Sequence, residues 1–190
     1  MKKRLLIAVS GGVLALTACS KNDRAADNGA TADTNIAMDN GVAAPAAADP
    51  LTAQGIANAA AASDRYEIET SKLAATAAGS AAVKSFAAKM ITAHEGSTAK
   101  LKSTLAGMSP AVTPDDTLSA EQQASLDLLK AKTGTDFDAA YKAAQVDAHQ
   151  KALDALNNYA ASGDNDTLKT FAKGLSPTVA AHLNMAKGLK

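Results

Sequence analysis

Apolar residues recur at every third or fourth position through most of the chain from residue 51 onward, and this spacing constrains the fold most strongly. It is the period of an α-helix that buries one face. The clearest stripe lies in 81–107 and just beyond, and consists of Val83, Phe86, Met90, His94, Leu101, Leu105 and Met108. No alternating stretch of the sequence is long enough for a β-strand. The sequence therefore predicts an all-α fold.

Glycine, proline and capping residues divide this pattern into helices. We predict helices over about 52–78, 81–107, 119–134 and 136–161. Ser119 with Gln122 has the spacing of a capping box, and Thr135 is the expected cap of the next helix. A last helix follows the stop at 162–166, and we expect Ser176-Pro177 to interrupt it.

The lengths of the connections predict the topology. The first two long helices form a hairpin around Gly79, and the last two form another around Gly163. About 27 residues, including the short helix, separate the two hairpins. A long crossover between two hairpins is the arrangement of a ferritin-like four-helix bundle. Because only 3% of the residues are aromatic and alanine dominates, the helices pack closely and leave no room for haem or flavin.

The first fifty residues predict export and membrane anchoring. Lys2, Lys3 and Arg4 precede a short apolar run that ends in the sequence LTAC, which resembles the lipobox of bacterial lipoproteins. We therefore interpret 1–18 as a signal peptide, 19–50 as the lipidated Cys19 followed by a polar tether, and 51–190 as the helical bundle. Ser20, in place of aspartate, favours anchoring at the outer membrane with the bundle facing the periplasm.

The charge balance argues against some partners. Without Lys2, Lys3 and Arg4, 16 of the 19 basic side chains remain against 19 acidic ones. A mildly acidic chain is not expected to bind nucleic acid, or anionic lipid through a basic face. The expected membrane contact is the lipid on Cys19, and the sequence indicates no particular protein partner.

Four segments resemble a family of exported bacterial proteins assigned to the ferritin-like bundles and catalogued as domain of unknown function 4142, with members described as outer-membrane proteins. The segments are DRYEIETSKLA (64–74), VKSFAAKMITAHE (83–95), FDAAYKAAQVDAHQKAL (137–153) and SGDNDTLKTFAKGLSPTVAAHL (162–183). The positions that recur in the family are Glu67, His94, Asp138, Tyr141, Gln145, His149 and His182. Ala93 departs from the family pattern, which often has aspartate there. The resemblance implies a fold and a compartment but no activity.

Four of these residues are expected to converge. Glu67 lies 12 residues before Gly79 and His94 lies 15 after it, while His149 lies 14 residues before Gly163 and His182 lies 19 after it. At about 1.5 Å per residue, all four reach the middle third of the bundle. One carboxylate and three imidazoles suit a single ion of zinc, copper, nickel or iron.

The remaining family positions are expected to support the site or the fold. Asp138 lies about 16 Å along the axis from His149, so we expect it to cap its own helix after Thr135. Tyr141 and Gln145 are expected as hydrogen-bond partners of the histidines, and such bonds would also explain core histidines that bind no metal.

The sequence supports a binding or scaffold module more than an enzyme. A di-iron centre of the ferritin type needs Glu-x-x-His motifs, and the sequence has none. No nucleophile elbow is present either. Three functions stay open: a module with a metal or small-ligand site in mid-bundle, a metal-dependent oxidoreductase with a reduced ligand set, and a purely structural envelope or stress protein.

Overall fold

The computed structural model describes residues 48–190, and they form an all-α bundle of five helices. The helices are α1 (Ala53–Ala77), α2 (Ala81–Leu105), α3 (Ala120–Lys130), α4 (Gly134–Ser162) and α5 (Asp166–Lys187). The expected signal peptide, Cys19 and the tether up to residue 47 lie outside the described residues. None of the helices described is long and apolar enough to cross a membrane.

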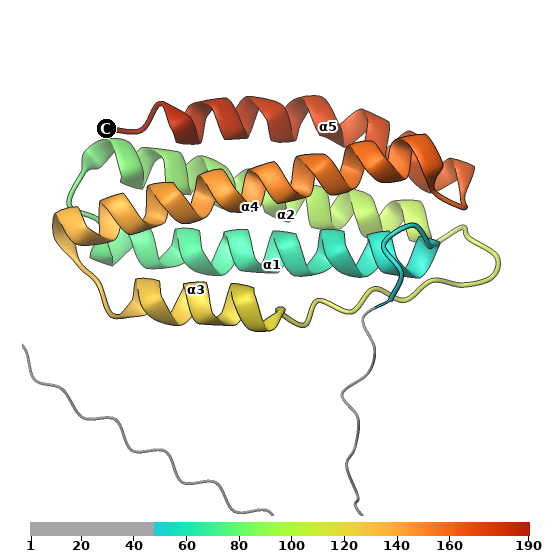
Figure 1. Cartoon of the computed structure of the whole chain (residues 1–190), viewed down its shortest axis with the longest axis horizontal. Helices are drawn as coiled ribbons and strands as arrows, with labels where there is room; N and C mark the ends of the chain where they lie inside the picture. The colour runs from blue at the N-terminus through green and yellow to red at the C-terminus, as the bar shows by residue number, and fades with distance from the viewer. Residues whose placement is uncertain (1–47) are drawn as a thin grey trace, which may run out of the picture. The chain divides into compact units, whose positions relative to one another are not determined.

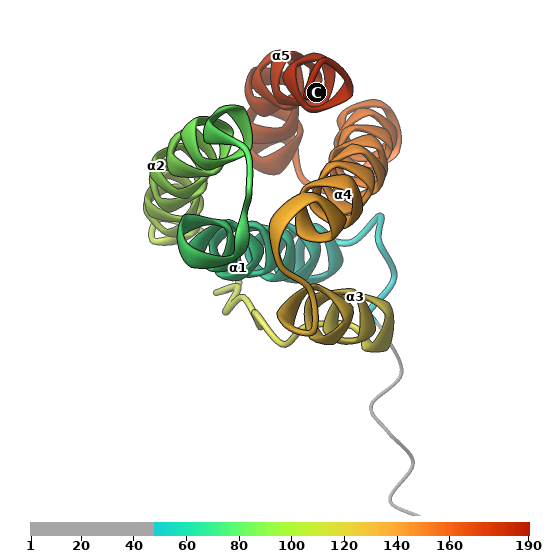
Figure 2. The same cartoon turned by 90° about the vertical axis from the view of Figure 1, so that its left-hand side faces the viewer.

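Four long helices form the ferritin-like bundle, with α3 outside it (Figure 1). In the end-on view of Figure 2, α1 lies between α2 and α4, and α5 closes the ring opposite α1. The α1–α2 and α4–α5 hairpins are joined by 106–133, which runs back along the bundle and places α3 against α1 and α4. The predicted pair of hairpins with a crossover carrying a short helix is confirmed.

Side-chain caps fix most of the helix starts. The Thr52, Ser80 and Asn165 side chains each accept a backbone N–H bond in the first turn of α1, α2 and α5 respectively. The predicted capping box between Ser119 and Gln122 is present at the start of α3.

The prediction for the start of α4 is wrong. The capping position is Thr133, which makes no side-chain cap bond, and Thr135 lies inside the helix. Asp138 instead caps the start of α2. Its carboxylate accepts backbone N–H bonds from Gly79 at 3.1 Å and Ser80 at 2.8 Å. The chain enters α4 through Gly134, whose φ of 61° suits glycine, and Gly134 pairs with Ala78 in a parallel bridge. This bridge brings Asp138 to the α1–α2 turn.

Pro177 does not interrupt α5, contrary to the sequence prediction. Proline cannot donate a bond to the carbonyl of Lys173, four residues earlier. Both residues are exposed, so water can satisfy that carbonyl. Ser176 also lies within the continuous helix, and its hydroxyl donates to the carbonyl of Ala172 at 3.0 Å.

The apolar core is divided into two clusters by a polar layer. One cluster includes Ile56, Leu101, Leu156 and Phe171, and the other includes Phe86, Met90, Phe137 and Tyr141. Among residues 48–190, eight polar residues are buried: Asp64, Glu67, Thr70, Ser71, His94, Gln145, His149 and His182. Burying so many polar groups costs free energy unless they are paired, which makes this layer the candidate site.

Candidate metal centre

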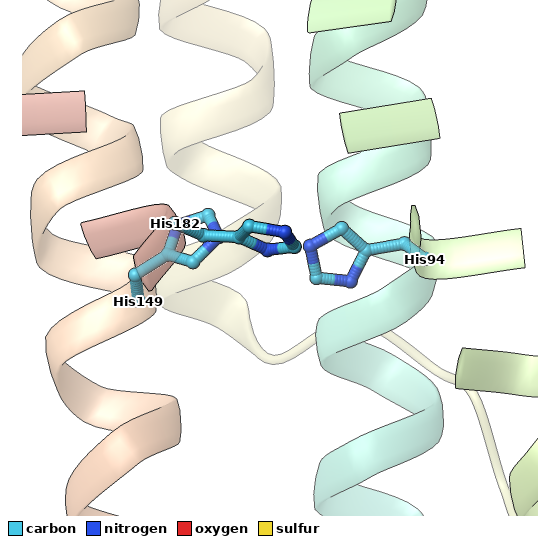
Figure 3. Close-up of side chains that lie close together, drawn as sticks. All are labelled: His94, His149 and His182. Carbon is cyan, nitrogen blue, oxygen red and sulfur yellow. The ribbon is translucent and has the colours of Figure 1, made fainter. Parts of the chain in front are cut away.

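Three histidines from three helices meet in the polar layer. His94 comes from α2, His149 from α4 and His182 from α5, and Figure 3 shows the rings of His149 and His182 reaching toward that of His94. The ring centroids are 5.5 to 5.9 Å apart. One nitrogen of each ring lies within 4.8 Å of the others, close enough to form a metal-binding group. The predicted convergence of the three imidazoles is therefore present in the structure.

Asp64 fixes the ring of His94. Nδ1 of His94 lies 2.8 Å from Oδ1 of Asp64, whose other oxygen accepts a bond from the Thr98 hydroxyl at 3.1 Å. Burial lowers the pKa of His94, but the bond to Asp64 and the nearby Glu67 charge outweigh it and the net pKa is raised. With Nδ1 engaged, the second nitrogen, Nε2, is buried and has no hydrogen-bond partner.

His149 is oriented by its own helix. Its Nδ1 donates to the backbone carbonyl of Gln145 at 2.8 Å, and its Nε2 is buried without a partner. Burial lowers the pKa of His149 to about 4, so the ring is neutral at pH 7. His182 also has a lowered pKa, for which burial is the main cause, and its Nδ1 is buried without a partner. Each of the three rings thus has one buried nitrogen that makes no hydrogen bond with any of the residues described.

Glu67 lies beside the three rings but outside the group that they form. Its Oε1 is 3.7 Å from Nδ1 of His149. That nitrogen already donates its proton to the Gln145 carbonyl. The residue is 1% exposed, and within residues 48–190 neither carboxylate oxygen accepts a hydrogen bond of normal geometry, although the nearby Gln145 side chain lowers the Glu67 pKa. Burial raises the pKa of Glu67 to about 7, although the nearby His94 opposes this shift.

The other predicted site residues serve the frame around the site. The Tyr141 hydroxyl pairs with Ser71 at 2.8 Å and not with a histidine. The Gln145 side chain lies 3.4 Å from the Thr70 hydroxyl, so this residue supports His149 through its backbone carbonyl only. Asp138 is bound at the α1–α2 turn.

Sequence reasoning missed Asp64, the residue that orients His94. A signal was present, because Asp64 lies three residues before Glu67 and therefore on the same face of one helix. It also opens one of the segments that resemble the family. The chain has Ala93 where the family pattern often has aspartate, and here the carboxylate next to His94 comes from α1.

A cavity of about 650 Å³ adjoins the histidines. All three rings and Glu67 contribute to its wall, together with small residues such as Ala93, Ser97, Ala148 and Ala152. The same wall includes Ser119 and Lys151, which are exposed. The cavity therefore extends from the protein surface to residues of the polar layer, while their unpaired nitrogen and carboxylate atoms are buried.

The sequence pattern of a family described as a domain of unknown function, DUF4142, matches residues 37–189. Among solved structures, that of CopM in the Cu(II)-bound form aligns with a TM-score of 0.61. The alignment covers 72% of this chain and 94% of that one, at 16% sequence identity. At this identity the likeness establishes the shared fold. No curated protein matches the chain.

Proposed function

This chain belongs to the DUF4142 family, and we propose that it is a metal-binding module that holds one transition-metal ion, with copper preferred, between His94, His149 and His182. The observation that carries the proposal is the set of three buried imidazole nitrogens without partners. Leaving a buried polar atom unpaired costs about 1–3 kcal/mol. Three such costs at one point of the core are compensated if the nitrogens share a ligand.

The surroundings of the rings suit this role. A histidine that binds a metal usually donates its other N–H to a carboxylate or a backbone carbonyl, which fixes the tautomer and the ring orientation. His94 has Asp64 for this purpose and His149 has the carbonyl of Gln145. Both bonds use Nδ1 and leave Nε2 for the ion.

The ligand spacing requires only a small adjustment. Nitrogen ligands about 2.0–2.1 Å from an ion in tetrahedral geometry are roughly 3.3 Å apart. The three nitrogens lie within 4.8 Å of one another. A bound ion would draw the three nitrogens up to about 1.5 Å closer together.

The donor set favours copper among the ions that imidazole binds. Imidazole suits zinc, copper, nickel and iron, and at a given site the affinity of divalent ions peaks at Cu²⁺. The related structure of CopM was solved with Cu(II), although at 16% identity this supports the choice without deciding it. No cysteine occurs among the residues described, so the site offers no thiolate.

We also propose that the protein is a lipoprotein of the outer membrane, with its bundle in the periplasm. The support for this is the LTAC motif and the basic, apolar segment before it. A tether of about 30 residues would allow the bundle to reach roughly 30 Å from the lipid on Cys19. The metal site would then face periplasmic solutes.

Metal-induced stabilisation tests the metal proposal. The Cys19→Ser chain, made without a histidine tag so that neither group competes for the ion, is melted with Cu²⁺, Zn²⁺, Ni²⁺, Fe²⁺ or Mn²⁺. An ion at 100 times its dissociation constant should add about 2.7 kcal/mol to the free energy of unfolding. We expect copper to give the largest increment and the double substitution His94→Ala with His149→Ala to abolish it. If no ion stabilises the wild-type site at neutral pH, the histidines are structural.

A further inference from the structure

We infer that a metal ion held by the three histidines keeps one coordination position open toward the cavity, so that the centre binds a small exogenous nitrogen- or oxygen-donor molecule. The inference rests on the proposed function. It goes further because it assigns a ligand site to the cavity and separates this centre from one that only stores an ion.

The number of protein ligands is the first argument. In zinc proteins, structural sites are closed by four protein ligands, whereas catalytic sites have three and keep a fourth position for water or substrate. The group here contains three nitrogens and no carboxylate. Asp64 is the nearest alternative, but both of its oxygens are engaged, one with His94 and the other with Thr98.

Glu67 lies beside the rings without joining the group of three nitrogens. Its nearest histidine contact is with Nδ1 of His149, on the side of the ring opposite the free Nε2. Both of its oxygens are buried and accept no hydrogen bond from any described residue. They are therefore unpaired hydrogen-bond acceptors, which a donor molecule in the cavity reaches only if the surrounding side chains move.

The cavity supplies the room. Its volume of about 650 Å³ is many times the roughly 30 Å³ that a water molecule occupies in the liquid. Its wall includes all three histidines, Glu67 and several alanines, and extends to the exposed Lys151. A molecule of a few atoms therefore fits in the cavity, and it reaches the buried histidine nitrogens only if the rings move.

The charges predict how tightly an anion binds. The Glu67 carboxylate lies 3.7 Å from Nδ1 of His149, so when it is ionised it repels an anion bound beside the rings. Replacing Glu67 with glutamine removes this repulsion and keeps the shape of the side chain. Binding of an anionic probe should therefore be weak in the wild type and at least about tenfold tighter in Glu67→Gln.

Azide is the probe for the experiment. Copper-loaded Cys19→Ser protein is titrated with azide, and the azide-to-copper charge-transfer band and the electron paramagnetic resonance spectrum are followed. Retained copper is measured after each titration. We expect a saturable band in the wild type, tighter binding in Glu67→Gln, and binding weakened at least about tenfold in Ala152→Leu, which narrows the cavity beside His149.

Ala143→Leu is the matched control, because Ala143 is exposed on the same helix and does not line this cavity. It should bind azide as the wild type does. Retained copper without any azide response in the wild type overturns the inference and leaves the metal proposal standing. An azide response in Glu67→Gln without one in the wild type also overturns the inference, because Glu67 would then occupy the coordination position proposed to be open. If the wild type does not retain copper, the metal proposal fails and the inference falls with it.

Discussion

At the scale of single residues, the site depends on which atom of each side chain is already engaged. Histidine has two ring nitrogens, and Asp64 and the Gln145 carbonyl each occupy one. Only the remaining nitrogen of each ring can bind a metal ion. Asp64 should therefore influence metal binding although it is not itself a ligand in the proposed centre.

Removing Asp64 should weaken copper binding without removing a ligand. We expect Asp64→Ala to lower the affinity by about 10- to 100-fold, the usual effect of losing such a supporting bond. Asp64→Asn should fall between wild type and alanine, because its carbonyl still accepts from Nδ1 but carries no charge. Competition titration with a copper chelator measures this series. Equal affinities for the wild type and Asp64→Ala would refute the supporting role.

Glu67 should make the metal-free protein less stable as the pH rises. Its pKa is raised from 4.5 to about 7, so the folded state holds the proton more tightly than the unfolded chain does. The resulting stability is complete below pH 4.5 and is lost as the pH rises to about 7. Relative to wild type, Glu67→Gln should gain up to about 3 kcal/mol over this window. Denaturant unfolding at several pH values measures the difference, and a difference independent of pH would contradict this explanation.

At the scale of the helices, the sequence predicted the elements well where the pattern was local. The long helices, the Ser119 capping box and the crossover follow from periodicity, cap residues and connection length. Errors arose where tertiary contacts decided the outcome. Asp138 was assigned to its own helix, but the bridge between Ala78 and Gly134 brings it to the start of α2. Pro177 was expected to break α5, but its exposed position lets the helix continue.

The same reasoning applies to the site. Counting along the helices placed the histidines at the correct height, since helical rise is regular. The direction of each ring and its partner depend on packing between helices, which periodicity does not specify. For this reason the contact of Asp64 with His94 was missed and Tyr141 was given the wrong partner.

Asp138 should matter for the stability of the bundle and not for the metal. Asp138→Ala removes the acceptor of two backbone N–H groups at the α1–α2 turn, so we expect a loss of about 1–2 kcal/mol. Copper affinity should be unchanged. This variant is also the control for general destabilisation, because its metal-induced increment should equal that of the wild type. A large loss of affinity would show that Asp138 acts on the centre.

At the scale of the whole molecule, the proposed ion joins two halves of the fold. His94 belongs to the α1–α2 hairpin, while His149 and His182 belong to the α4–α5 hairpin. An ion bound by all three would cross-link the hairpins at the polar layer, where the two apolar clusters of the core separate. Metal binding should therefore stabilise the bundle as a unit.

Anchoring is a separate prediction at this scale. Cys19→Ser should accumulate as a precursor without lipid that is not cleaved before position 19, because the modified cysteine is the expected new N-terminus. Mass spectrometry of protein from the envelope fraction tests this. An unmodified Cys19 in the mature wild-type protein would rule out the lipid anchor.

The position of the copper itself tests the central claim most directly. Crystals of the copper-loaded protein, measured with X-rays on both sides of the copper absorption edge, locate the ion without reference to its ligands. The proposed centre predicts one anomalous peak in the polar layer, about 2.0–2.1 Å from one nitrogen each of His94, His149 and His182. A copper ion at any other place, with the three rings left uncoordinated, would contradict the proposed function.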